Sequence, residues 1–265
     1  MEDVCLIDES IATALVTEPL KQSLIEADSL ELVAGLRAEA VAERGAYALL
    51  GSVDAALLLA SHSVVTDFAL VSGHSGPYAL WTPTRPDEID NVPVALDGVS
   101  RTAEAIARAT IHHFFGITVA GWERDTGEGQ AVVREGAGAL RAAELGELND
   151  LVRAWYVLTN FPFATHLLVV PKALTEQPER VAALVRTLQQ ALDAGIEHRR
   201  EIRRDLTNEF DLDRDKLVDF QNDQKHTLSK SARKAWLDLL RRVQRPLRLQ
   251  ESPRPDFVTL GTEEG

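Results

Sequence analysis

A turn of small polar and charged residues, Asp97–Thr102, is the part of the sequence best suited to bind an anion. It leads from a short apolar run into a helix that the spacing predicts over 103–115. Free N–H groups at a helix N-terminus favour negative charge, and the hydroxyls of Ser100 and Thr102 add donors. Arg101 can pair with a carboxylate through two parallel hydrogen bonds. The same residues also suit ordinary helix capping, so ligand contact and capping both stay open.

A second polar loop, Ser72-Gly73-His74-Ser75, lies between strand-like runs at 64–70 and 78–82. Loops of this kind often line binding sites, which makes Ser72, His74 and Ser75 candidates to line a cleft. His74 is a candidate general base, because an imidazole titrates near neutral pH. A solvent-exposed turn is the alternative for the whole loop.

The composition excludes several classes of protein. The 265 residues carry 28 Lys and Arg against 41 Asp and Glu, a formal charge of −13, which disfavours nucleic acid or an anionic membrane as partner. The single cysteine, Cys5, excludes an intramolecular disulfide and a CxxC-type metal site. The neighbouring His112 and His113 point about 100° apart on a helix and do not chelate. We expect no metal and no cofactor, since no P-loop, GxGxxG or zinc pattern occurs.

The sequence also bears on location. Its first residues lack the basic and apolar regions of a secretory signal, and no run approaches the ~18 apolar residues of a membrane span. We therefore expect a cytoplasmic protein without a membrane partner. The oligomeric state stays open.

Alternating strands and helices predict the α/β class. Further predicted elements are a helix face over 30–40, a loop at 120–129, a strand at 164–170, and helices at 178–204, 213–222 and 229–243. A Pro-rich break at 83–86 and the strand at 164–170 suggest two crossings between lobes. The first lobe would comprise 1–88 and 167–265, and the second the inserted 89–166. A cleft between two such lobes is a common place for a ligand.

Three stretches carry a resemblance to a known family: Val94–Thr102, Asp150–Trp155 and Leu158–Phe163. They resemble the chorismate dehydratase family of the futalosine route to menaquinone, which has a strand ending in a Ser-Arg-Thr turn and an Asp-Leu-x-x-x-Trp helix. The resemblance implies a two-lobed fold similar to the type II periplasmic binding proteins. It also places Ser52, in the run Gly51–Asp54, among small polar residues of the cleft.

The sequence differs from the family pattern at three places. Ala103 replaces a serine, the run Glu9–Thr13 lacks an expected asparagine, and Ala137 stands where the family has an aspartate. The resemblance implies a lyase that converts chorismate to 3-enolpyruvylbenzoate. The differences motivate the alternative, a solute-binding or sensor protein of the same fold without catalysis.

The expected ligand is a small anionic metabolite, specifically a carboxylate. The residues predicted to bind it are Ser52, Ser72, Gly73, Ser100, Arg101 and Thr102. No catalytic residue is assigned. Trp155, Phe161 and Phe163 are expected in the interlobe core or the cleft wall. The Arg/Glu-rich face at 197–204 is typical of a solvated surface, and an interaction protein that uses it is a third interpretation.

Overall fold

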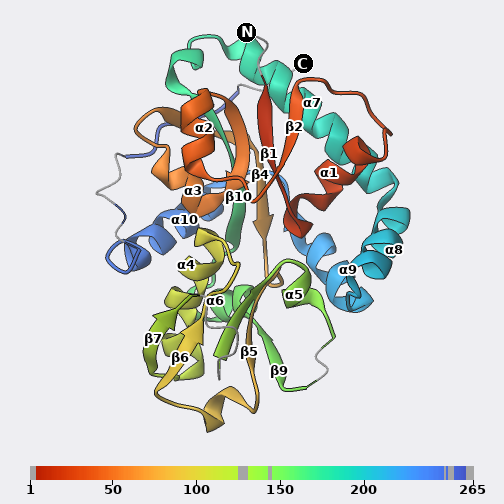
Figure 1. Cartoon of the computed structure of the whole chain (residues 1–265). Coiled ribbons are helices and arrows are strands. Elements are labelled where there is room, and N and C mark those ends of the chain that lie inside the picture. Colours follow the sequence, from red (N-terminus) through yellow and green to blue (C-terminus); the bar gives the residue numbers. More distant parts are fainter. Residues whose placement is uncertain (1–3, 125–130, 143–144, 248, 250–253, 261–265) are drawn as a thin grey trace.

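A computed structural model describes residues 4–124, 131–142, 145–247, 249 and 254–260 of the chain. Two lobes, each built on its own β-sheet, lie one above the other (Figure 1). The predicted α/β class and two-lobed architecture are confirmed. Part of the predicted loop at 120–129 lies outside the described residues, as does part of the chain after Pro246.

The sheet of the upper lobe has a mixed strand order. β1 pairs in parallel with β2 and β3, and β10 pairs antiparallel with β3 and β4. In order across the sheet, the strands are β11 (Gln224–Lys225), β4 (His62–Ser72), β10 (Phe163–Pro171), β3 (Tyr47–Gly51), β1 (Cys5–Glu9) and β2 (Leu30–Ala34), with β12 (Phe257–Val258) paired to β4.

Side-chain alternation explains why this sheet is covered on both faces. In β1, Cys5 and Ile7 pack on the side of α1 (Ala14–Lys21) and α7 (Pro178–Glu197). Leu6 packs on the side of α2 (Ala38–Arg44), α3 (Ser52–Leu57) and α10 (Lys230–Val243). In β3, Tyr47 likewise packs on the side of α1 and α7, and Ala48 packs on the opposite side. Successive strand residues point to opposite faces, so an almost continuously apolar strand needs helices on both.

The helices and helical turns complete the two lobes. The upper lobe contains η1 (Ile11–Thr13), α1 (Ala14–Lys21), α2 (Ala38–Arg44), α3 (Ser52–Leu57), η4 (Lys172–Leu174), α7 (Pro178–Glu197), α8 (Arg199–Phe210), α9 (Arg214–Asp223) and α10 (Lys230–Val243). The lower lobe contains η2 (Pro86–Glu88), α4 (Arg101–Thr110), the π-helical turn η3 (Ile111–Phe115), α5 (Ala137–Leu140) and α6 (Leu151–Thr159).

The sheet of the lower lobe contains a strand that the sequence placed elsewhere. Its strands are β7 (Val119–Glu123), β6 (Val92–Ala95), β8 (Ala131–Glu135), β5 (Tyr78–Thr82) and β9 (Glu147–Asp150). The expected first lobe, 1–88, included β5, but β5 pairs antiparallel with β8 and β9 of the lower sheet.

The two crossings between lobes therefore lie at 73–77 and 160–162, where β4 ends and β10 begins. The expected boundary at 166/167 also cuts β10, which pairs with the upper sheet from Phe163 onward. The Pro-rich break at 83–86 instead belongs to a loop at the bottom of the lower lobe (Figure 1). A proline-rich turn indicates only that the chain changes direction. Such a turn occurs in a loop at the end of a strand as readily as at a hinge between lobes.

Three local predictions are wrong. Residues 30–34 form strand β2 rather than the start of a helix, because they pair along β1 before Gly35 turns the chain with a φ of 63°. Val119–Glu123 forms the edge strand β7 rather than a loop. The helix predicted over 178–204 breaks at His198, whose φ of −94° and ψ of 14° separate α7 from α8.

Candidate functional site

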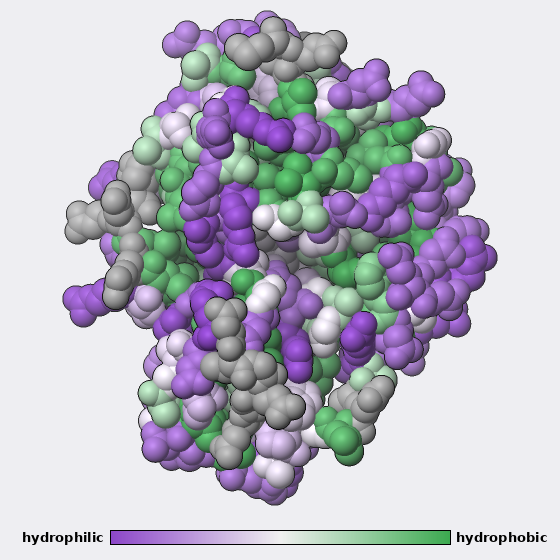
Figure 2. All heavy atoms as spheres, viewed as in Figure 1, coloured by the Kyte–Doolittle hydropathy of each residue, from purple (hydrophilic) through white to green (hydrophobic). Residues whose placement is uncertain are grey.

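A cavity of about 200 Å³ lies between the lobes. Purple, hydrophilic side chains gather along the junction of the upper and lower lobes in Figure 2. The upper lobe contributes Asp8, Glu9, Ser10, Gly35, Leu36, Arg37, Gly51, Asp54 and His166 to the lining, and the lower lobe contributes Tyr78, Gly98, Ser100 and Glu135. The lining is therefore polar, and both lobes are needed to complete it.

The topology explains why these residues meet. Asp8 and Gly51 lie at the carboxyl ends of the parallel strands β1 and β3, and Glu135 lies at the end of β8. Ligands of open α/β sheets bind outside the carboxyl ends of the strands. His166 comes from the antiparallel β10, directly opposite Gly51, which has no side chain to fill the space between them.

The buried His166 and the partly buried Asp8 form a pair on the upper side of the cavity. The Nε2 of His166 lies 3.1 Å from an Asp8 carboxylate oxygen, and the other oxygen accepts a hydrogen bond from the Leu36 N–H at 2.9 Å. A carboxylate only accepts, so in the neutral imidazole Nε2 carries the proton and Nδ1 has the lone pair. Among the described residues Nδ1 has no hydrogen-bond partner, although the side chain is 3% exposed. The pair thus offers an oriented, unpartnered base.

Glu135 faces the cavity from the lower lobe. Its carboxylate accepts hydrogen bonds from the Ser100 N–H at 2.6 Å and the Ser100 hydroxyl at 2.7 Å. Burial nevertheless raises the pKa of the Glu135 carboxyl, because these two hydrogen bonds offset the loss of water only in part. A carboxyl with a raised pKa keeps its proton to a higher pH than an exposed glutamate does, which suits a general acid.

Three aromatic rings in edge-to-face contact lead away from the cavity wall. Tyr78 lines the cavity and packs edge-to-face on Phe163, with ring centroids 5.7 Å apart. Phe163 packs in the same way on Trp155, which donates its indole N–H to the Pro162 carbonyl. Burial raises the pKa of Tyr78 well above its usual value, and the charges of Glu135 and Asp8 add to this. Tyr78 is therefore a neutral hydrogen-bonding group in the wall.

Arg101 is occupied by carboxylates of the upper lobe. Its guanidinium bonds to the buried Asp54 at 2.5 Å and to the exposed Glu39 at 2.7 Å and 3.1 Å. Since α4 belongs to the lower lobe and both acids belong to the upper lobe, these contacts join the lobes. Glu39 and Asp54 raise the pKa of Arg101, and Arg101 lowers that of Glu39. We define Arg101, Glu39 and Asp54 as the interlobe latch.

The structure brings one of the six predicted ligand-binding residues, Ser100, into the cavity lining. Ser100 also caps α4, since its hydroxyl accepts from the Ala103 N–H at 3.1 Å, so both interpretations of this turn apply to the same side chain. Thr102 is buried beside Gly51, and its hydroxyl accepts from the Val53 N–H at 3.2 Å. A Cβ at Gly51 would lie 2.9 Å from that hydroxyl, so the close contact of the two lobes requires glycine.

The other predicted residues lie away from the cavity lining. Ser52 and Ser72 are fully buried, and neither hydroxyl has a partner among the described residues. Gly73 lies against Asp223, which accepts hydrogen bonds from the His74 and Ser75 N–H groups. The His74 ring is 63% exposed and lies 3.0 Å from Asp223. These contacts with Asp223 therefore hold the first crossing, 73–77, against the C-terminal end of α9.

The cavity residues Asp8, Glu135 and His166 were not singled out from the sequence. Each lies within or at the end of an apolar strand, and that position is the feature that could have identified them. His166 and Asp8 are 158 residues apart, so no local spacing connects them.

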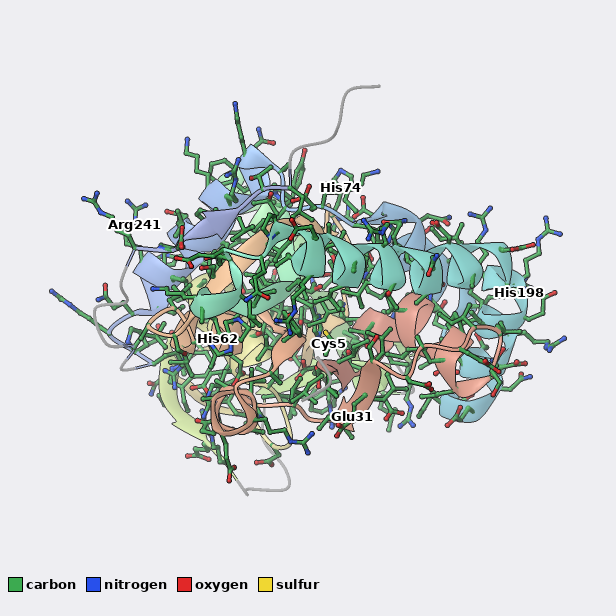
Figure 3. All side chains as sticks on the ribbon, turned by 90° about the horizontal axis from the view of Figure 1, so that it is seen from above. Cys5, Glu31, His62, His74, His198 and Arg241 are labelled. Carbon is green, nitrogen blue, oxygen red and sulfur yellow. The ribbon has the colours of Figure 1, made fainter. Side chains whose placement is uncertain are left out.

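The remaining chemistry-bearing residues lie elsewhere. Cys5 is in the middle of the upper lobe in Figure 3, and burial raises the pKa of its thiol to about 12. His112 and His113 lie on η3 and pack edge-to-face. Within the described ranges no group of three or more His, Cys, Asp or Glu side chains is arranged to hold a metal ion. Nor does any described helix have the length and apolar character to cross a membrane.

Comparison with known families identifies the chain. The profile of the menaquinone biosynthesis family matches residues 13–245, which include both lobes and most of the cavity lining. The chain belongs to the menaquinone biosynthesis family. A search of curated proteins finds no match.

Several solved structures have the same fold as this chain. Protein AF1704 from Archaeoglobus fulgidus is 13% identical, with a TM-score of 0.68 over 93% of this chain and 98% of its own. The periplasmic aliphatic sulphonate-binding protein SsuA from Escherichia coli is 10% identical, with a TM-score of 0.63 over 100% and 96%. The alkanesulfonate-binding protein SsuA from Xanthomonas axonopodis, bound to MOPS, is 11% identical, with a TM-score of 0.66 over 98% and 99%. At these identities the likeness establishes the periplasmic-binding-protein-like fold.

Proposed function

We propose that this menaquinone biosynthesis family protein is a lyase that eliminates water from chorismate in the interlobe cavity, giving 3-enolpyruvylbenzoate. The observation that carries the proposal is the His166–Asp8 pair, which faces Glu135 across one small cavity. Elimination needs a base for a carbon-bound proton and an acid for the departing hydroxyl.

The two groups divide the reaction between them. The Nδ1 of His166 takes the ring proton, while Asp8 holds Nε2–H and stabilises the imidazolium that forms, as an aspartate does for a catalytic histidine elsewhere. The electron pair of the broken C–H bond completes the aromatic ring as the C–O bond breaks. Glu135 gives its proton to the departing hydroxyl, which leaves as water.

A carboxylate of the substrate needs a cation, and Arg37 is the best-placed one. Arg37 lines the cavity, and its nearest carboxylate contact, to Asp54, is 3.8 Å long. Arg101, which the sequence favoured, is already shared between Asp54 and Glu39. Guanidinium groups bind carboxylates in paired hydrogen bonds, so Arg37 takes the role expected of Arg101.

Where the sequence differs from the family pattern, neighbouring residues supply polar groups to the cavity. Ala137 leaves the aspartate position without a carboxylate, and Glu135, two residues earlier, supplies one to the lining. The run that lacks the asparagine begins beside Asp8, and Ser10 within it lines the cavity. These substitutions support a working acid–base site and weigh against a protein that only binds.

Substrate access requires the lobes to separate. A volume of about 200 Å³ is below the ~300–1,000 Å³ usual for ligand pockets. Closure of two lobes around a ligand is a common motion in folds of this kind and would exclude water from the reaction. We further propose a cytoplasmic location, which the biosynthetic family supports.

The experiment is turnover by the full chain with chorismate, with 3-enolpyruvylbenzoate quantified by chromatography. We expect product from the wild type and about a thousandfold less from His166→Gln. His113→Gln, an exposed histidine of the lower lobe, is the matched control and retains full rate. A chain that is stabilised thermally by chorismate yet forms no product from pH 5 to 9 is a binding protein, and the lyase proposal fails.

A further inference from the structure

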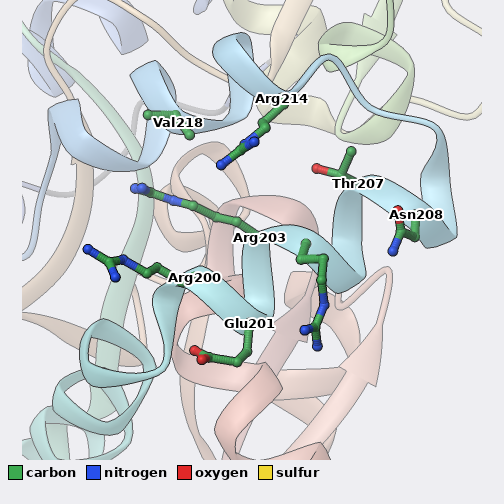
Figure 4. A pocket seen from close by; sticks show the side chains of 8 residues that line it. Arg200, Glu201, Arg203, Thr207, Asn208, Arg214 and Val218 are labelled. Carbon is green, nitrogen blue, oxygen red and sulfur yellow. The ribbon is translucent and has the colours of Figure 1, made fainter.

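A second pocket lies on the upper lobe, and four of its eight lining residues are arginines. It measures about 670 Å³ and lies between α8 and α9. Figure 4 shows Arg200, Arg203 and Arg214 extending toward the same side of this pocket. Its lining residues are Arg200, Glu201, Arg203, Arg204, Thr207, Asn208, Arg214 and Val218, which we call the arginine pocket.

Most of the positive charge in the arginine pocket is uncompensated. Within the described part of the chain, Arg200 and Arg214 make no ion pair, although the protein carries 41 acidic residues. Arg204 alone is paired, with Asp205 at 2.9 Å. Glu201 is the one acid in the lining. Guanidinium groups that make no ion pair with the described residues, such as those of Arg200 and Arg214, stay available to an anion from solution.

Arg203 is held in position by neutral groups. Its Nε donates to the Gln221 side-chain oxygen at 2.7 Å, and one Nη donates to that of Asn222 at 2.8 Å. Both partners are uncharged, so the guanidinium keeps its full charge while its orientation is fixed. Burial lowers the pKa of Arg203, and the nearby Arg199 adds to this, which shows how crowded with cations the region is.

Two buried polar atoms of α8 and α9, one of them on the Gln221 side chain that Arg203 contacts, have no hydrogen-bond partner among the described residues. Gln221 is 5% exposed, and its side-chain NH₂ has no partner among the described residues. The hydroxyl of Thr207, in the pocket lining, is also buried without one. Buried polar groups are nearly always satisfied, and each exception needs an explanation, such as a ligand or ordered water.

We propose that the arginine pocket binds a small metabolite carrying a diphosphate group. Planar guanidinium groups match phosphate oxygens, and the three arginines without an ion pair among the described residues, offset in part by Glu201, favour a ligand with two or more negative charges such as a diphosphate. The volume fits a ligand of nucleotide size rather than a single ion. The net charge of the whole chain, −13, disfavours a long polyanion such as nucleic acid, because the protein surface outside this pocket would repel it.

The test is isothermal titration of the full chain with inorganic pyrophosphate. We expect one binding event per chain, weakened at least about tenfold in the double variant Arg200→Ala/Arg214→Ala, because each loses charge-assisted hydrogen bonds. Both side chains are exposed, so the variant keeps its fold, which circular dichroism verifies. Arg186→Ala, an exposed arginine of α7, is the matched control and binds as the wild type does.

Three results would overturn the proposal: no binding at millimolar pyrophosphate, equal binding by the double variant, or equally tight binding of malonate, which would indicate an unselective cationic surface. Binding of pyrophosphate in the interlobe cavity would be detected by a loss of affinity in Arg37→Ala instead. The proposal does not depend on the lyase activity, and failure of one leaves the other standing.

Discussion

The interlobe cavity and the arginine pocket both gather charged side chains, but the charges meet different partners. In the cavity, Asp8 meets His166 and Glu135 meets Ser100, so each carboxylate has protein donors. In the arginine pocket, Arg200 and Arg214 meet no carboxylate of the described residues. Internally paired groups are suited to moving protons, whereas unpaired cations are suited to holding an anion.

The largest expected effect tests whether chemistry belongs to the cavity. His166→Gln removes the base but keeps a donor for Asp8, and we expect kcat to fall about 10³-fold while the protein stays folded. Steady-state turnover of chorismate with a parallel urea unfolding curve measures both. His113→Gln controls for loss of a histidine. Unchanged kcat in His166→Gln would remove the cavity pair from the mechanism.

Glu135→Gln is the next largest effect. Because burial raises the pKa of Glu135, the wild type keeps the protonated acid to a higher pH than an exposed glutamate and loses rate as pH rises through that pKa. We expect kcat of the variant to be about a hundredfold lower and its alkaline limb to disappear. A pH–rate profile from 5 to 9 decides this. If the alkaline limb persists in the variant, another group is the acid.

The sequence could predict the anion-suited turn but not the reacting pair. Ser100 follows a strand and begins a helix, and capping preferences are local enough to place it. His166 and Asp8 meet only because β10 pairs with β3 and β3 with β1. Strand order is set by long-range packing, which residue spacing does not encode.

The wrong predictions of local structure and of the role of Arg101 also come from long-range contacts that residue spacing does not encode. The spacing of apolar residues at 30–40 fits a helix face, but pairing with β1 provides backbone hydrogen bonds that a strand needs. Arg101 has the chemistry of a carboxylate clamp, and the family resemblance favoured it. The acids it meets, Glu39 and Asp54, lie on other elements that fold back onto α4.

The interlobe latch gives a prediction about stability rather than rate. Arg101→Met leaves the buried Asp54 carboxylate without its closest cation, and we expect a loss of about 1–3 kcal/mol in the free energy of unfolding. Small-angle scattering should show a larger radius of gyration, because the ion pairs of Arg101 no longer hold the lobes together and the Thr102–Val53 hydrogen bond remains as a weaker link. Glu39→Gln removes only the exposed partner and should cost under about 0.5 kcal/mol. Equal effects of the two variants would contradict a latch centred on Asp54.

Asp150 provides a pH-dependent test of stability and a control for Glu135. It caps α6 through the Val152 and Arg153 N–H groups and accepts from Gly76 in the first crossing, outside the cavity lining. Burial raises the pKa of Asp150 from 3.8 to about 6. A raised folded-state pKa means that the folded chain holds this proton more tightly, so its contribution to stability is full below about pH 4 and is lost by about pH 6.

Asp150→Asn cannot titrate, so its stability should fall less than that of the wild type between pH 4 and 6, by roughly 2 kcal/mol. Urea unfolding at four pH values across this window measures the difference, and other groups cancel because both proteins share them. The pH–rate profile of Asp150→Asn should keep the alkaline limb assigned to Glu135, since Asp150 does not line the cavity. Parallel stability curves for the two proteins would show that the three backbone donors fully compensate the burial of this carboxylate, and the same reasoning would then weaken the case for a proton held on Glu135.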